Sequence, residues 1–162
     1  MKIVIEGREM AEKLAPLIIL PHAIISIGEP EPRREEDTGP AKFGESKQRL
    51  GLLRLQFYDI DVDSITNAGY LLEIRKMQKE YGNGLFTDDQ ADQIVDFVEN
   101  MRGKIEVLLC HCEAGISRSS GMAAAIMRIL TGSDDEVFNN PKYIPNRFVY
   151  RKILNAWERR QK

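Results

Sequence analysis

The feature that most constrains the fold is a cysteine loop between an apolar run and an alanine-rich helical pattern. Residues 105–110 form a short apolar run that is rich in branched side chains, which predicts a buried strand. Residues 121–130 have the pattern of a helix that ends at Gly132. Such a short passage from strand to helix points successive backbone N–H groups inward and predicts an oxyanion site. The intervening residues are His111-Cys112-Glu113-Ala114-Gly115-Ile116-Ser117-Arg118-Ser119.

The side chains of this loop suit phosphoryl transfer through a cysteine. A thiol has an ordinary pKa of about 8.5, and a helix N-terminus with nearby cations lowers it to about 3.5–7.5. Cys112 directly precedes the predicted helix, and Arg118 lies close enough to favour its thiolate. The planar guanidinium of Arg118 can also hold two phosphate oxygens. Gly115 lets the backbone approach the anion, and the Ser119 hydroxyl can donate a hydrogen bond to the thiolate.

Structural roles are assigned to the two residues that precede Cys112. Cys110 falls within the predicted strand, which favours a core residue over a redox partner, because a disulfide with Cys112 would require backbone rearrangement. His111 is expected to orient the loop by hydrogen bonding rather than to act as a base. The chain has only two cysteines, one of them needed as a thiolate, which predicts a reducing compartment and a cytoplasmic location.

The loop resembles the signature of the cysteine-dependent protein tyrosine phosphatases, particularly their dual-specificity branch. The resemblance implies an α/β fold in which a mostly parallel mixed sheet of four to five strands is flanked by helices. It implies that Cys112 attacks phosphorus, that Arg118 binds the transferring phosphoryl group and that Ser119 is the partner of the thiolate. No metal or cofactor is required by that mechanism, because an aspartate on a separate loop protonates the leaving oxygen and then activates water. The implied oxyanion cradle is the backbone of Glu113, Ala114, Gly115, Ile116, Ser117 and Arg118.

The general acid is sought at the end of another strand. Residues 50–57 form an apolar strand pattern that runs into aspartates at alternate positions. A carboxylic acid on a separate segment can close over the phosphate. In the phosphatases that the loop resembles, the acid follows such a strand, behind an aromatic residue and one further residue. Asp59 fits this placement best, ahead of Asp61 and then Asp63. Asp63 also stands at a plausible helix start, which favours a capping role there.

The chain is longer between Asp59 and Cys112 than the compact dual-specificity pattern. The extra length is an inserted segment at residues 60–85, whose middle is predicted to be helical. Its position and length favour contact with the rim of the active site, as a lid or a substrate-recognition flap; the alternative is an extra surface helix. The loop at residues 28–46 is rich in proline, glycine and charge and is expected to be mobile. Residues 1–162 are predicted to form one phosphatase domain.

The rest of the chain supplies strands, helices and caps around this loop. Further strands are predicted at residues 2–5 and 23–27, with a short helix at 8–14. Thr87 begins a capping box for a helix with one apolar face. The triplet Pro145-Asn146-Arg147 resembles a motif of prokaryotic and phage-type members of this phosphatase group. Asn146 is a natural N-cap for the last helix, so a structural role suffices for it.

The predicted function is metal-independent hydrolysis of phosphotyrosine, with phosphoserine and phosphothreonine as further substrates, through a phosphocysteine. Glu113 is acidic and the loop contains no lysine, which favours a phosphorylated protein or peptide over a phosphoinositide. A phosphoinositide or RNA 5′-phosphate, or a non-catalytic phospho-binding role, stays open as an alternative. The formal net charge of −2 gives no electrostatic reason to expect nucleic acid, and no apolar stretch is long enough to predict a membrane span.

Overall fold

The computed structural model describes residues 1–30, 39–65, 69–81 and 84–162. Residues 31–38, the middle of the loop that the sequence predicts to be mobile, lie outside the described residues. The elements follow the predicted order of strands and helices. They are β1 (Lys2–Gly7), α1 (Arg8–Leu14), η1 (Ala15–Leu17), β2 (His22–Gly28), β3 (Arg49–Gln56), η2 (Val62–Ser64), α2 (Tyr70–Tyr81), α3 (Asp88–Met101), β4 (Val107–Cys112), α4 (Arg118–Thr131), α5 (Asp135–Phe138) and α6 (Arg147–Arg160).

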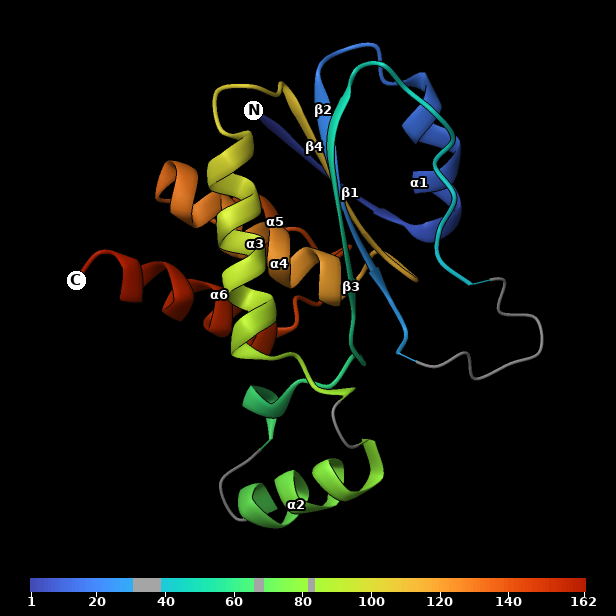
Figure 1. The fold of residues 1–162 in the computed structure, drawn as a ribbon. Coiled ribbons are helices and arrows are strands. Elements are labelled where there is room, and N and C mark those ends of the chain that lie inside the picture. Colours follow the sequence, from blue (N-terminus) through green and yellow to red (C-terminus); the bar gives the residue numbers. More distant parts are fainter. Residues whose placement is uncertain (31–38, 66–68, 82–83) are drawn as a thin grey trace.

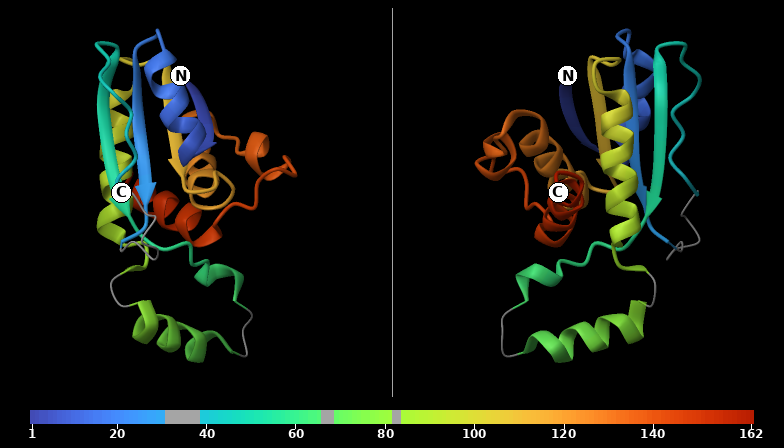
Figure 2. Two further views of the ribbon diagram at one scale, coloured as in Figure 1. Left: turned by 90° about the vertical axis from the view of Figure 1, so that its right-hand side faces the viewer. Right: turned by 60° about the vertical axis from the view of Figure 1, so that its left-hand side comes forward.

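The four strands form one sheet in the order β1-β4-β2-β3, and every strand pair in the described residues is parallel (Figure 1). The predicted α/β fold class is therefore confirmed. Parallel strands need crossover connections, which places helices on both faces of the sheet. Figures 1 and 2 show α1 on one side of the sheet and α3, α4 and α6 on the other.

The central strand β4 is buried along its whole length, because it lies between β1 and β2 and is covered by helices on both faces. Alternate side chains of β4 enter different cores. Leu108 and Cys110 pack with α3, α4 and α6, whereas Leu109 packs with Ala11 of α1. The strand also ends two residues later than its apolar run predicts, since pairing with β1 continues as far as Gly7 opposite Cys112. Cys112 is consequently the last residue of a strand fixed on both sides.

Local signals set the ends of the helices that hold the sheet in place. The predicted capping box of α3 is present, with Gln90 N donating to Thr87 Oγ1 over 3.1 Å and Thr87 N donating to Gln90 Oε1 over 3.0 Å. Gly132 ends α4 in the left-handed conformation at φ +81°, which glycine adopts without strain. Asn146 caps α6 as predicted, because its Oδ1 accepts from Val149 N over 3.0 Å.

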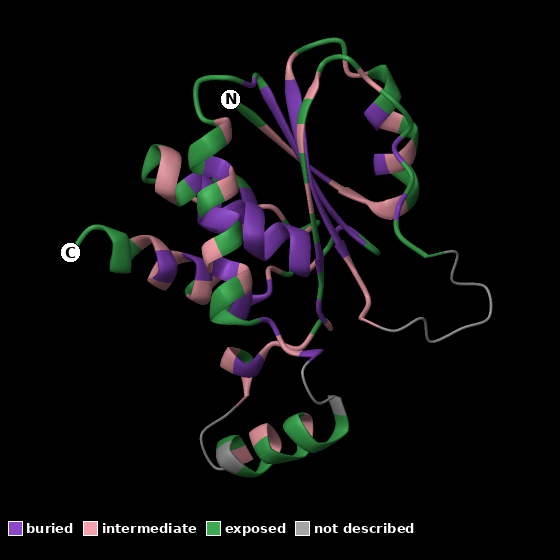
Figure 3. Cartoon of the chain, in the orientation of Figure 1, coloured by how far each residue is buried: buried purple, intermediate pink, exposed green. Residues whose placement is uncertain are grey.

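The inserted segment forms the helix α2, which stands beyond the carboxyl ends of the strands (Figure 1). Ile74 and Met77 are partly buried against the main core, while most of the remaining described side chains of α2 are exposed (Figure 3). Residues 66–68 and 82–83 of the insertion lie outside the described residues. The helix predicted from the middle of the insertion is thus present at the edge of the sheet that also holds the cysteine loop.

Candidate active site

Cys112 lies where β4 meets the loop at residues 113–117, and two groups point at its sulfur. Ser119 Oγ lies 3.1 Å from Cys112 Sγ, and Gly115 N donates to the same sulfur over 3.3 Å. The side chain is 2% exposed. Both groups can donate hydrogen bonds to a sulfur that carries negative charge, which is the form that acts as a nucleophile.

The loop is wound tightly because Gly115 occupies the left-handed region, with φ +73°. A Cβ atom at this position would lie 2.4 Å from Gly7 N, at the turn from β1 to α1. The same turn holds the loop from the other side, since Arg8 N donates to Glu113 O over 3.0 Å. Only glycine satisfies both the dihedral angle and the close approach. The first strand therefore helps to shape the loop that follows the last one.

Ser117 is the N-cap of α4 but makes no capping bond with its side chain. Its hydroxyl donates instead to Asp59 Oδ1 over 2.8 Å. The N–H groups of the first helical turn are therefore not capped by this side chain and are available to an anion. Of the predicted cradle residues, Gly115 and Arg118 are buried, whereas Glu113, Ala114 and Ile116 are exposed.

Arg118 is the buried cation of the site, with only 4% of its surface exposed. Its Nη1 donates to Phe57 O over 2.8 Å, and its Nη2 lies 3.0 Å from Glu29 Oε1. Its Nε is buried and has no hydrogen-bond partner within the described part of the chain. A buried donor of this kind is costly unless an acceptor meets it, and a phosphoryl oxygen is a suitable acceptor. Glu29, the residue after β2, was not predicted from the sequence.

Asp59, the predicted general acid, is held by the cysteine loop and by the start of α6. Its Oδ1 accepts from Ser117 Oγ over 2.8 Å and from Asn146 Nδ2 over 3.0 Å. Asn146 is itself joined to the loop, because its backbone N donates to Ser117 O over 3.0 Å. Both side-chain donors end on the same carboxylate oxygen, which leaves Oδ2 as the oxygen that can carry a proton.

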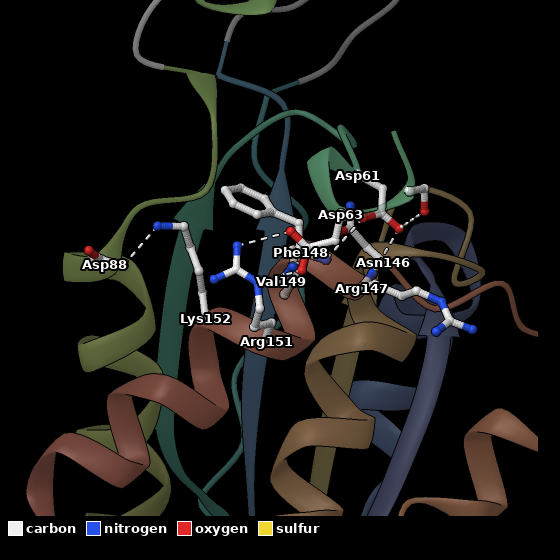
Figure 4. A network of polar contacts seen from close by, with 10 residues as sticks. Asp61, Asp63, Asp88, Asn146, Arg147, Phe148, Val149, Arg151 and Lys152 are labelled. Carbon is white, nitrogen blue, oxygen red and sulfur yellow. Dashed lines mark hydrogen bonds and ion pairs between the residues drawn. The ribbon is translucent and has the colours of Figure 1, made fainter. Parts of the chain in front are cut away.

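The other two candidate acids are engaged elsewhere (Figure 4). Asp61 lies outside α6 and accepts hydrogen bonds from the first turn of that helix. Arg147 N donates to its Oδ2 over 2.9 Å and Phe148 N to its Oδ1 over 3.1 Å. Asp63 pairs with the guanidinium of Arg151 at 2.5 and 3.0 Å. The capping role expected for Asp63 thus belongs to Asp61, and the capped helix lies far along the chain. Neither carboxylate is bonded to the cysteine loop by a described contact.

Cys110 and His111, the two residues before Cys112, are both buried. His111 Nε2 lies 2.6 Å from Ser26 Oγ, and its Nδ1 donates to Cys112 O over 3.1 Å. Burial lowers the pKa of His111, which favours the neutral ring and agrees with an orienting role. Burial raises the pKa of Cys110 to about 12, which makes this thiol a poor nucleophile.

The fold is that of solved cysteine-dependent protein tyrosine phosphatases and of their dual-specificity branch. The solved structure of PTPMT1 is similar to the chain with a TM-score of 0.55 and 15% identity, covering 99% of this chain and 94% of that one. The structure of DUSP15 is similar with a TM-score of 0.52 and 18% identity, covering 98% of this chain and 85% of that one. The structure of Tk-PTP is similar with a TM-score of 0.50 and 14% identity, covering 98% of this chain and 93% of that one. No protein-family model and no curated protein matches the chain in sequence.

Proposed function

We propose that residues 1–162 form a metal-independent phosphatase domain that hydrolyses phosphotyrosine through a phosphocysteine. The observation that carries the proposal is the bond between Ser117 Oγ and Asp59 Oδ1, because it ties a carboxylic acid to the cysteine loop. The buried Nε of Arg118, which has no hydrogen-bond partner among the described residues, supports a phosphoryl group as the ligand of that loop. A nucleophile, a cation and an acid in one place are the parts that acid-assisted phosphoryl transfer needs.

In the first step, the Cys112 thiolate attacks phosphorus and the S–P bond forms as the bond to the leaving oxygen breaks. Asp59 transfers the proton of its carboxyl group to that oxygen, so the leaving group departs as a neutral alcohol or phenol. The loop N–H groups and Arg118 neutralise charge on the three equatorial oxygens. Because Oδ1 is held by two donors, the transferred proton is assigned to Oδ2.

In the second step, water attacks the phosphocysteine and the S–P bond breaks. The Asp59 carboxylate accepts a proton from that water, inorganic phosphate forms, and the electron pair returns to sulfur. Ser119 Oγ, 3.1 Å from the sulfur, donates a hydrogen bond to the thiolate as it leaves. The acid of the first step therefore becomes the base of the second.

A phosphorylated protein or peptide is the proposed substrate class, because Glu113 is exposed at the loop and the loop contains no lysine. A phosphoinositide is the second candidate, since PTPMT1, which shares the fold, has been solved in complex with PI(5)P. We expect kcat/KM for a phosphotyrosine peptide to exceed that for a soluble short-chain phosphoinositide by roughly tenfold or more, because the exposed carboxylate of Glu113 would face the negative charge of the inositol head group. Phosphate release from both substrates, measured with a metal chelator present, tests the ranking. A higher kcat/KM for the phosphoinositide would reject the protein-substrate proposal.

The acid assignment gives a second expected result. Asp59→Asn should lower kcat by roughly 10²–10⁴-fold for a substrate with a poor leaving group. The loss should shrink for an activated aryl phosphate, whose leaving oxygen needs little protonation. Asp61→Asn is the matched control, because Asp61 accepts from the first turn of α6 through both oxygens. The amide keeps one of these acceptors, so the main effect should be a stability loss of about 1 kcal/mol. Both variants are tested by measuring kcat for a series of substrates whose leaving groups differ in pKa. If kcat depends steeply on the leaving group in Asp61→Asn and not in Asp59→Asn, the general acid is Asp61.

A further inference from the structure

A run of exposed apolar side chains lies at the end of the molecule opposite the candidate active site. Residues 16–21 read Pro-Leu-Ile-Ile-Leu-Pro and run from within η1 to the residue before β2; they are called the apolar loop below. Leu17 is 71% exposed, Ile19 84% and Leu20 44%, whereas Ile18 packs against the core of the α1 face. Three large exposed apolar side chains within one short segment favour an interaction site.

The apolar loop is fixed in its exposed position by its backbone. His22 Nδ1 donates to Leu20 O over 2.9 Å, and Glu106 N donates to Pro21 O over 2.8 Å. The prolines at both ends restrict the backbone further. These bonds hold the backbone at Leu20 and Pro21, so the exposed side chains stand on a backbone of defined conformation.

Lysines lie at the same end of the sheet as the apolar loop. Lys2, Lys47 and Lys104 are exposed and lie at or just before the starts of β1, β3 and β4. The segment that enters β2 is at this end of the sheet too (Figure 1). Backbone bonds place these segments side by side, since Lys2 N donates to Glu106 O over 2.8 Å and His22 N donates to Gln48 O over 2.9 Å. The acidic residues Glu45 and Glu106 are also exposed in these segments.

We propose that the apolar loop inserts into the surface of an anionic lipid bilayer, with Lys2, Lys47 and Lys104 against the lipid head groups. Apolar side chains beside basic ones suit the interface between head groups and acyl chains. A second protein copy fits less well, because a narrow loop cannot supply the ~800 Å² that a standard interface buries on each partner. A bilayer needs no complementary shape. None of the helices among the described residues could cross a membrane, and interfacial insertion requires no such helix.

The apolar loop lies at the amino ends of the parallel strands, and the cysteine loop lies at their carboxyl ends (Figure 1). A protein bound through the apolar loop would turn its candidate active site away from that bilayer. Binding is measured without any substrate, so it can fail or succeed independently of the proposed phosphatase activity.

Sedimentation of the full chain with large vesicles tests the proposal. We expect the protein to sediment with vesicles of phosphatidylcholine mixed with phosphatidylserine, and less with phosphatidylcholine alone. Ile19→Gln should lower the partition coefficient by roughly tenfold or more, because a well-buried isoleucine side chain contributes at least that factor. Leu72→Gln is the matched control, since Leu72 is 75% exposed on α2 at the other end of the molecule. Thermal melting should be unchanged in both variants.

A charge-reversed variant completes the test. Lys47→Glu combined with Lys104→Glu should weaken binding to the mixed vesicles and leave binding to phosphatidylcholine nearly unchanged. The proposal is wrong if the unmodified protein stays in the supernatant with both vesicles, or if Ile19→Gln binds as tightly as the unmodified protein. A dimer in light scattering that Ile19→Gln dissociates, without vesicle binding, would assign the apolar loop to a second copy and overturn the proposal.

Discussion

Cys112→Ser is expected to remove hydrolysis of an aryl phosphate almost completely. Serine retains the shape of the side chain and the hydrogen bonds around it, but its hydroxyl stays protonated where a thiolate would form. Removal of the nucleophile in a well-studied hydrolase costs about 10⁶ in kcat, and a loss of roughly 10⁵–10⁶ is expected here. Steady-state release of the phenol measures the loss, and binding of inorganic phosphate should persist. Hydrolysis at an undiminished rate would contradict the phosphocysteine mechanism.

The second cysteine supplies the control for this prediction. Cys110 lies two residues earlier on the same strand, is fully buried and packs in the main core. Cys110→Ala should keep kcat within about tenfold and lower stability by about 1–2 kcal/mol, since it deletes one buried sulfur. Alkylation of the native protein should modify Cys112 alone, and bound phosphate should protect it. The two cysteines would then differ in chemistry because only one lies at the loop.

The strand–loop–helix unit was predictable because its signals are local. The apolar run, Gly115 and the glycine that ends α4 lie within a short stretch, and each has a physical reason that does not depend on the rest of the chain. The same holds for the capping box at Thr87 and for Asn146 as an N-cap. Strand boundaries were less predictable, because β4 ends where its pairing with β1 ends and not where its apolar run ends.

Contacts between distant residues could not be predicted from those signals. Glu29 meets Arg118 because β2 and β4 are neighbours, and the order of strands in a sheet is not contained in any single segment. Asn146 illustrates the same limit, since its capping bond was predictable and its bond to Asp59 was not. Asp61 was a candidate acid by spacing alone, and only the position of α6 shows that it caps a helix. Tertiary placement thus separates two aspartates that sequence makes nearly equivalent.

Arg118→Lys is the second change with a large expected effect, because lysine keeps the charge and loses the geometry. The guanidinium of Arg118 uses Nη1 for Phe57 O and Nη2 for Glu29, and it still has Nε to offer a phosphoryl oxygen. A lysine has a single nitrogen for all three directions, so it cannot be anchored to the protein and still present a separate donor to phosphate as the guanidinium does. We expect kcat to fall by on the order of 10³-fold and inhibition by inorganic phosphate to weaken in parallel.

Glu29→Gln separates anchoring from charge in this prediction. It leaves the guanidinium intact and replaces the carboxylate that lies 3.0 Å from Nη2 with a neutral acceptor. If the fixed orientation of Arg118 is what matters, this variant should keep kcat within about tenfold, because the bond from Nη1 to Phe57 O remains. If Arg118→Lys instead lowers kcat no more than Glu29→Gln does, the separate N–H donors of the guanidinium are not used in catalysis. The cation would then act only as a point charge, which a buried lysine supplies equally well.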